Sequence, residues 1–120
     1  MKRYTEQHEW VSIDGDVATV GISNHAAAEL GDITFVEIPD VDEVMKQGDQ
    51  IAVVESVKAA ADVYSPITGV VSEVNEELED SPERVNEDAE GDGWICRLSG
   101  IVVADVETLM TESAYKEFCK

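Results

Sequence analysis

Short β-rich runs separated by turn residues fill most of this chain, and they limit the possible folds more than any other feature of the sequence. The segment 9–13 alternates apolar and polar residues, and Asp14-Gly15 then favours a tight hairpin turn. The segment 17–22 is the expected returning strand, and 51–54 is apolar enough to be buried on both faces. Many short strands of this kind indicate a compact sandwich or barrel, so the sequence predicts a mainly β fold.

Helical patterns are confined to three segments, one of which is a short helix that Ser81-Pro82 would cap and begin within the acidic stretch 73–92. The pair Ser23-Asn24 caps a short alanine-rich helix over 25–30. Near the C-terminus, apolar residues at helical spacing predict an amphipathic helix over about 105–119, and a break near Thr111 stays open. The periodic positions are Val106, Leu109, Met110, Ala114, Tyr115, Phe118 and Cys119.

The side chains carry a large excess of negative charge, with 27 acidic against 8 basic residues and a formal net charge of −19. This excess argues against a nucleic acid partner, because polyphosphates bind clustered Lys and Arg. It argues against anionic membrane surfaces for the same reason. It favours protein partners with basic pockets, where complementary charge speeds encounter.

The sequence also predicts the compartment. No apolar run approaches the roughly 20 residues that span a bilayer, and the start of the chain lacks the apolar core of a signal peptide. Cys96 and Cys119 lie far apart without CxxC spacing, so we expect both to be reduced thiols. These features predict a cytoplasmic protein, and the lack of a transit peptide favours a bacterial one.

No set of catalytic or metal-binding residues is evident along the sequence. A GxSxG elbow and glycine-rich phosphate loops are absent. His8 and His25 are interpreted as structural histidines, since two isolated His and two isolated Cys show no zinc-ligand spacing. The run 86–91 imitates the start of a calcium loop, but its twelfth position is Arg97 instead of a bidentate Glu. We therefore expect neither an enzyme nor a metal site.

One lysine stands out among the five in the chain. Lys58 lies in the segment 55–66, is followed by three alanines and is flanked by apolar β-rich runs, so we expect it near a strand reversal. It is either a solubilising lysine on a hairpin or an attachment point for a modifying group. An attachment point requires a long reach, small neighbours and a rigid sheet beneath it.

The segment 55–66 with Gly69 resembles the lipoylation motif of glycine cleavage system H-proteins, ESVKA-x-x-D-x-x-x-P-x-x-G. The similarity continues in order along nearly the whole chain, through 8–11, 17–22, 25–26, 30–32, 35–39, 73–75, 85–86 and 93–94. Each fragment alone is weak, but the series is specific to this family.

The resemblance implies one domain over 1–120 with a lipoyl-domain-like, barrel-sandwich hybrid fold and lipoic acid bound covalently to Lys58. It implies a carrier and not an enzyme, which takes the aminomethyl group of glycine from the pyridoxal-phosphate-dependent glycine decarboxylase (P-protein). The group passes to the tetrahydrofolate-dependent aminomethyltransferase (T-protein), and dihydrolipoamide dehydrogenase (L-protein) reoxidises the dithiol. A lipoate ligase or octanoyltransferase installs the arm. By the same resemblance, Glu9 and Asp62 help to line the cleft that holds it.

A second function from another class stays open, namely a lipoyl-relay protein that donates lipoyl groups to 2-oxoacid dehydrogenase complexes. A biotin carrier fits less well, because that family prefers methionines where Val57 and Ala59 flank the lysine. A protein that enters several active sites is most simply a monomer. The sequence departs from the family over 88–94, after His25-Ala26 and over 99–104, all away from Lys58.

Overall fold

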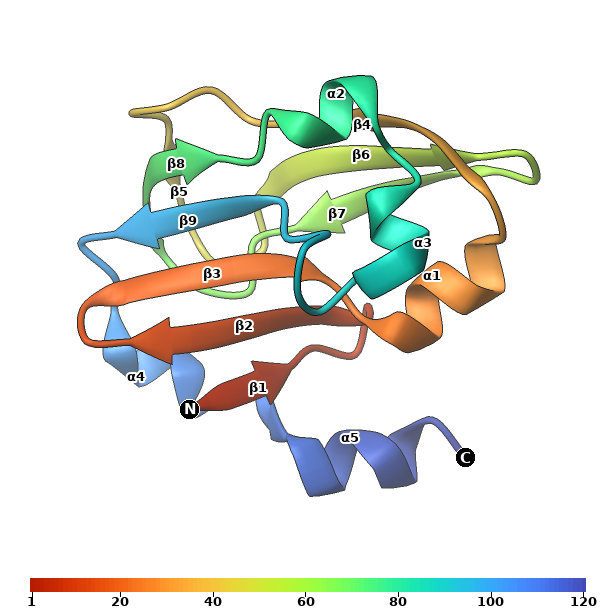
Figure 1. Ribbon diagram of the computed structural model, residues 1–120. Helices are drawn as coiled ribbons and strands as arrows, with labels where there is room; N and C mark the ends of the chain where they lie inside the picture. Colours follow the sequence, from red (N-terminus) through yellow and green to blue (C-terminus); the bar gives the residue numbers. More distant parts are fainter.

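Two antiparallel β-sheets form the framework of the computed structural model, which describes residues 1–120 (Figure 1). The larger sheet has the strand order β10-β1-β2-β3-β9-β8-β5, and the smaller sheet has the order β4-β6-β7. The strands are β1 (Lys2–Tyr4), β2 (Glu9–Asp14), β3 (Val17–Ile22), β4 (Ile33–Glu37), β5 (Val44–Met45), β6 (Gln50–Ser56), β7 (Ala60–Tyr64), β8 (Gly69–Val74), β9 (Cys96–Ser99) and β10 (Met110–Thr111). The helices are α1 (Asn24–Leu30), α2 (Glu77–Asp80), α3 (Arg84–Asp88), α4 (Val103–Val106) and α5 (Glu112–Phe118).

Local turn and capping residues explain the first part of the chain. Asp14 pairs with Val17 across the β2–β3 hairpin, and Gly15 adopts a φ of 65°, a left-handed conformation that glycine tolerates without strain. Ser23 begins α1, and its side chain accepts a hydrogen bond from the Ala26 backbone N–H. The predictions of this hairpin and of this short helix are confirmed.

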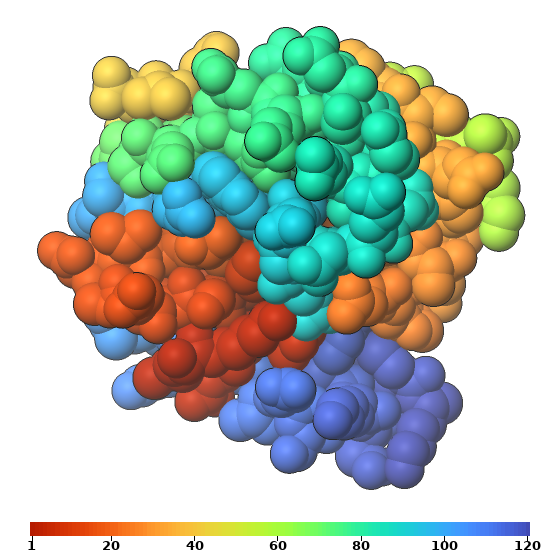
Figure 2. Space-filling view, viewed as in Figure 1, coloured from red at the N-terminus to blue at the C-terminus, as the bar shows by residue number.

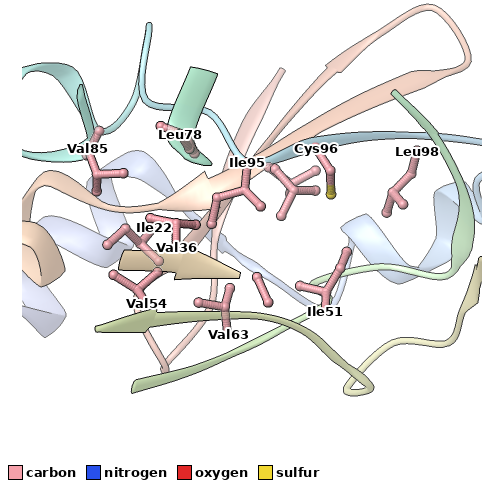
Figure 3. Packing of buried hydrophobic residues seen from close by; sticks show 14 of the residues in the cluster. Ile22, Val36, Ile51, Val54, Val63, Leu78, Val85, Ile95, Cys96 and Leu98 are labelled. Atoms are coloured by element: carbon pink, nitrogen blue, oxygen red, sulfur yellow. The ribbon is translucent and has the colours of Figure 1, made fainter. Parts of the chain in front are cut away.

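The core lies between the two sheets. Cys96 and Leu98 of the larger sheet and Val54 and Val63 of the smaller sheet are all almost fully buried, and Figure 3 shows them in one packed layer. Burying a valine or leucine side chain stabilises a fold by about 1.5–3 kcal/mol. The whole core cluster contains 21 buried residues, drawn from both sheets and from α1, α2, α3 and α4.

The helix expected over about 105–119 is wrong in its extent, whereas the break left open near Thr111 is present. The structure has the short helix α4, then β10, and then α5. Met110 and Thr111 pair with Tyr4 and Arg3 of β1, so this edge strand interrupts the helical periodicity. The Thr111 side chain then accepts a hydrogen bond from Ala114 N–H and starts α5.

The C-terminal helix α5 lies against the N-terminal part of the chain. Tyr115 of α5 stacks on Tyr4 with ring centroids 4.2 Å apart. Figure 2 shows the C-terminal segment packed against the N-terminal strands at the lower edge of the molecule. None of the helices has the length and the apolar character that crossing a membrane requires.

Candidate functional site

The hairpin that joins β6 to β7 holds Lys58 at its tip. Ser56 ties this turn together: its backbone N–H donates to the Ala59 carbonyl at 2.8 Å, and its Oγ accepts from the backbone N–H groups of Lys58 and Ala59, each at 3.2 Å. A hydroxyl that holds two successive amides fixes a tight turn without help from a glycine. The prediction that Lys58 lies at a strand reversal is confirmed.

The tip is also anchored to the end of α1, to the start of β4 and to the connection between them. The Val57 backbone N–H donates to the Asp32 carbonyl at 3.1 Å, and the Thr34 hydroxyl donates to the Glu55 carbonyl at 3.2 Å. Lys58 Nζ donates to the Glu29 carbonyl at 3.1 Å. The turn is therefore a rigid platform, and only the lysine side chain extends from it toward a neighbouring element.

Gly31 shapes the surface along which the Lys58 side chain lies. This glycine ends α1 with a φ of 79°, and a Cβ added to it would lie 3.7 Å from Lys58 Cε. The backbone conformation there favours glycine. Lys58 itself is exposed and forms no ion pair with a carboxylate. Figure 2 shows the tip of the hairpin protruding at the right edge of the molecule.

Glu9 is a buried carboxylate at the start of β2, only 2% exposed. The Thr5 hydroxyl donates to one of its oxygens, and the Tyr64 backbone N–H donates to the other at 3.1 Å. Burial raises the pKa of Glu9 above its ordinary value of 4.5, although both hydrogen bonds oppose this shift. A buried acid with donors on both oxygens and no basic partner is unusual, because burial penalises the charged form.

A cavity of about 280 Å³ opens beside Glu9. It lies between the β1–β2 connection, the end of β7 and the segment that leads into β10. Its wall includes hydroxyl, amide and carboxyl groups as well as four hydrophobic residues. The lining residues are Tyr4, Thr5, Glu6, Gln7, Glu9, Gln47, Gly48, Tyr64, Ser65, Pro66, Thr108, Leu109 and Met110.

The structure brings only part of the expected site together. Glu9 lines the cavity and contacts Tyr64, at the end of β7. Lys58 lies beyond the opposite end of β7, a strand of five residues that spans about 13 Å at 3.3 Å per step. Asp62 does not line the cavity; it is exposed on β7 opposite Val53 of β6. β7 thus forms a direct path between the lysine and the cavity, with Asp62 midway along it.

Sequence reasoning missed several residues of this region. Ser56 is recognisable in retrospect, because a serine two positions before a turn residue commonly caps the turn amides. The Glu29 carbonyl that holds Lys58 is a backbone group, and the sequence has no signal for it. The cavity wall over 108–110 depends on the pairing of β10 with β1, a long-range contact that local patterns do not encode.

The residues at the tip fit a group attached through an amide to Lys58. The amine is accessible at a protruding turn, its partner is a single carbonyl, and no buried charge is left unpaired when the amine is acylated. A small β protein that presents one lysine in this manner on a rigid hairpin belongs to the class of lipoyl-domain-like, barrel-sandwich carriers. The comparisons with known proteins identify the family within this class.

The sequence profile of the family described as "Glycine cleavage H-protein" matches residues 2–120, so the chain belongs to this family. It is 51% identical over 119 residues to the glycine cleavage system H protein of Thermotoga maritima, covering 99% of this chain and 96% of that protein. It is 56% identical over 115 residues to the protein of the same name from Alteromonas mediterranea, covering 95% and 89% of the two chains. The crystal structure of a glycine cleavage system H protein from Mycobacterium marinum aligns with a TM-score of 0.86 at 34% identity, over 97% of this chain and 94% of that one. These matches confirm the family and the fold expected from the sequence.

Proposed function

We propose that the chain carries a lipoyl group on Lys58 and serves the glycine cleavage system as the carrier of the aminomethyl group of glycine. It takes this group from glycine decarboxylase and delivers it to the tetrahydrofolate aminomethyltransferase, and dihydrolipoamide dehydrogenase reoxidises the dithiol. The observation that supports this proposal most strongly is the position of Lys58 on the Ser56-braced hairpin tip, within a chain that belongs to the H-protein family.

For a lipoyl group to be attached, the Lys58 amine first has to break its hydrogen bond to the Glu29 carbonyl. The Nζ atom then attacks the carbonyl carbon of an activated lipoyl group, such as the acyl adenylate that a ligase makes from lipoate and ATP. The amide bond forms as the bond from that carbon to AMP breaks, and Nζ releases a proton. When bound, the lipoyl group supplies a dithiolane sulfur that accepts the aminomethyl group and later releases it. The hairpin backbone keeps its own hydrogen bonds throughout, so the arm moves while the platform beneath it stays fixed.

Glu9 and its cavity are the proposed resting place for the loaded arm. An aminomethyl group carries a positive charge at neutral pH, and Glu9 is the buried carboxylate of this cavity. A cation beside it favours the ionised carboxylate that burial alone disfavours. Asp62 has an outer role in this proposal: it lies on the exposed face of β7 and attracts the cation along its path.

The chain itself supplies no chemical step in this proposal, and it works as a monomer. Its partners are the three enzymes named above together with the lipoate ligase or octanoyltransferase that modifies it. We propose a cytoplasmic location, because both of its cysteines are free thiols and free thiols persist in a reducing compartment. A bacterial source is consistent with relatives such as those from Thermotoga maritima and Parvibaculum lavamentivorans. Its charge of −19 suits brief encounters with basic surfaces on several partners.

The direct functional test is the exchange of labelled carbon dioxide into the carboxyl group of glycine by purified glycine decarboxylase. The lipoylated chain should support this exchange, and the same chain without lipoate should support none above background. Lys58→Arg should abolish it after treatment with ligase, whereas Lys46→Arg, at another exposed lysine, should leave it intact.

The same preparations distinguish the two candidate functions. Exchange with glycine decarboxylase supports the carrier. A lipoylated chain that gives no exchange but donates its lipoyl group to the lipoyl domain of a 2-oxoacid dehydrogenase would establish the relay and overturn the carrier proposal.

A further inference from the structure

Three metal-binding side chains that are distant in the sequence meet between α1 and α5. His8 lies in the connection before β2, His25 is in the first turn of α1, and Cys119 follows the last residue of α5. One ring nitrogen of each histidine and the Cys119 sulfur all lie within 4.8 Å of one another. The two imidazole rings are 4.8 Å apart between centroids. Neither Lys58 nor the lining of the cavity beside Glu9 supplies a residue of this cluster, although Glu29 contacts both Lys58 and His25.

One ring nitrogen of each histidine already has a hydrogen-bond partner. His8 Nδ1 lies 2.6 Å from the Tyr115 hydroxyl, and Tyr115 in turn lies 2.7 Å from Ser23 Oγ. His25 Nε2 lies 2.8 Å from a carboxylate oxygen of Glu29. Metal-bound histidines are commonly oriented in this way, with the second nitrogen donating to a carboxylate or another polar group. In the tautomers that donate from His8 Nδ1 to the Tyr115 hydroxyl and from His25 Nε2 to Glu29, the remaining nitrogens, His8 Nε2 and His25 Nδ1, carry lone pairs for a cation.

We propose that His8, His25 and Cys119 form a binding site for a divalent ion of the zinc type. Two imidazoles and one thiolate are borderline-soft ligands that suit Zn²⁺, and the fourth tetrahedral position is left for water. The ligand set excludes Mg²⁺ and Ca²⁺, which require oxygen ligands.

The geometry is close to what such an ion needs. With metal–ligand bonds of about 2.0–2.3 Å, tetrahedral ligand atoms lie roughly 3.3–3.6 Å apart, so the most distant pair of the cluster has to close by up to about 1.2–1.5 Å. Cys119 lies directly after the last residue of α5, so a small shift of that helix end would close the distance. All three side chains are half-buried, which leaves an entry path, and the charge of −19 attracts cations.

Binding has a structural consequence that is easy to observe. The ion would join α5 to α1 and to the start of β2, three elements that now meet through aromatic packing and hydrogen bonds. It stabilises the native chain in proportion to its concentration over its dissociation constant. The C-terminal helix gains the most, because one of the ligands is at its end.

Titration with Co²⁺, a spectroscopic substitute for Zn²⁺, tests the proposal on the full chain without lipoate, kept reduced by a phosphine. We expect one ion per chain, with the visible bands of tetrahedral Co²⁺ and a near-ultraviolet thiolate-to-cobalt band, both lost when Zn²⁺ is added. Cys119→Ser should remove the thiolate band and weaken binding roughly 10-fold or more. His8→Asn should also weaken it, and asparagine suits this position because His8 has a φ of 69°.

Cys96→Ala is the matched control. Cys96 is the only other thiol, is buried in the core, and its pKa is raised to about 12 by burial, so it is unsuited to bind a metal. The control should keep both sets of bands. Absence of the thiolate band in the folded wild-type chain, or its persistence in Cys119→Ser, would overturn the proposal. Cys119 lies outside the main core cluster, so its replacement leaves the fold testable by circular dichroism.

Discussion

At the scale of single residues, Glu9 is placed where a carboxylate lowers the stability of the fold. It is 2% exposed, has no basic partner, and burial raises its pKa above 4.5. A group whose pKa is higher in the folded chain than in the unfolded one stabilises the fold at low pH, and that contribution is lost as pH rises through the folded value. Under the proposed function, the cation on the loaded arm accounts for a carboxylate in this position.

Glu9→Gln should therefore raise the free energy of unfolding at neutral pH, by an amount on the order of 1 kcal/mol. The glutamine oxygen still accepts from the Tyr64 N–H, and its amide N–H donates to the Thr5 oxygen, so both polar ends of the side chain keep a partner while the Thr5 hydroxyl has to reorient. The difference from wild type should vanish below about pH 4.5, where the wild-type acid is protonated in both states, and should grow as the pH rises. Urea unfolding at pH 4 and at pH 7 measures both values.

Glu6→Gln provides the control, since Glu6 is an exposed acid in the same connection. It should change stability little at either pH. A Glu9→Gln effect that is equal at both pH values would contradict the account of Glu9 as a buried, ionised acid.

At the scale of elements, the lysine hairpin depends on one side chain. The Ser56 hydroxyl holds the backbone N–H groups of Lys58 and Ala59, and strand pairing on either side sets the register from Glu55 opposite Ala60. A modifying enzyme has to bind this turn, and binding is faster when the turn already holds a single conformation. Ser56 is therefore expected to affect how fast Lys58 is modified more than whether it is modified.

Ser56→Ala should lower kcat/KM for lipoylation by a ligase roughly 5-fold, the equivalent of about 1 kcal/mol for lost turn hydrogen bonds. Ser72→Ala, which alters an exposed serine of β8, should have no effect. Rates of lipoate incorporation measured over a range of chain concentrations give both values. An unchanged kcat/KM in Ser56→Ala would show that the turn is fixed by the strands alone.

The helices and strands also differ in how well the sequence predicts them. The β2–β3 hairpin and α1 were predictable because their signals, Asp14-Gly15 and Ser23, are local. The tail was not, because β10 exists only through its pairing with β1, about a hundred residues away. Apolar residues at helical spacing over 105–119 serve two short helices and an edge strand instead of one long helix.

At the scale of the whole molecule, segments far apart in the sequence lie together and form contacts that no local sequence pattern predicts. Lys58 was predictable, because its recognition segment is contiguous in the sequence. The contact of Glu9 with Tyr64, the contact of Lys58 with Glu29 and the cluster of His8, His25 and Cys119 all join distant segments. The histidines and cysteines lacked ligand spacing for this reason, and the sequence therefore predicted no metal site.

The central claim is that Lys58 is the single attachment point of the carrier arm, and mass spectrometry tests it most directly. After incubation with a lipoate ligase, ATP and lipoate, the intact wild-type chain should gain the mass of one lipoyl group, and peptide mapping should place it on Lys58. The Lys58→Ala chain should gain none under the same conditions, with Lys46→Ala modified like wild type. A wild-type chain that stays unmodified while the ligase modifies a known lipoyl domain, or a lipoyl group mapped to another lysine, would contradict the account.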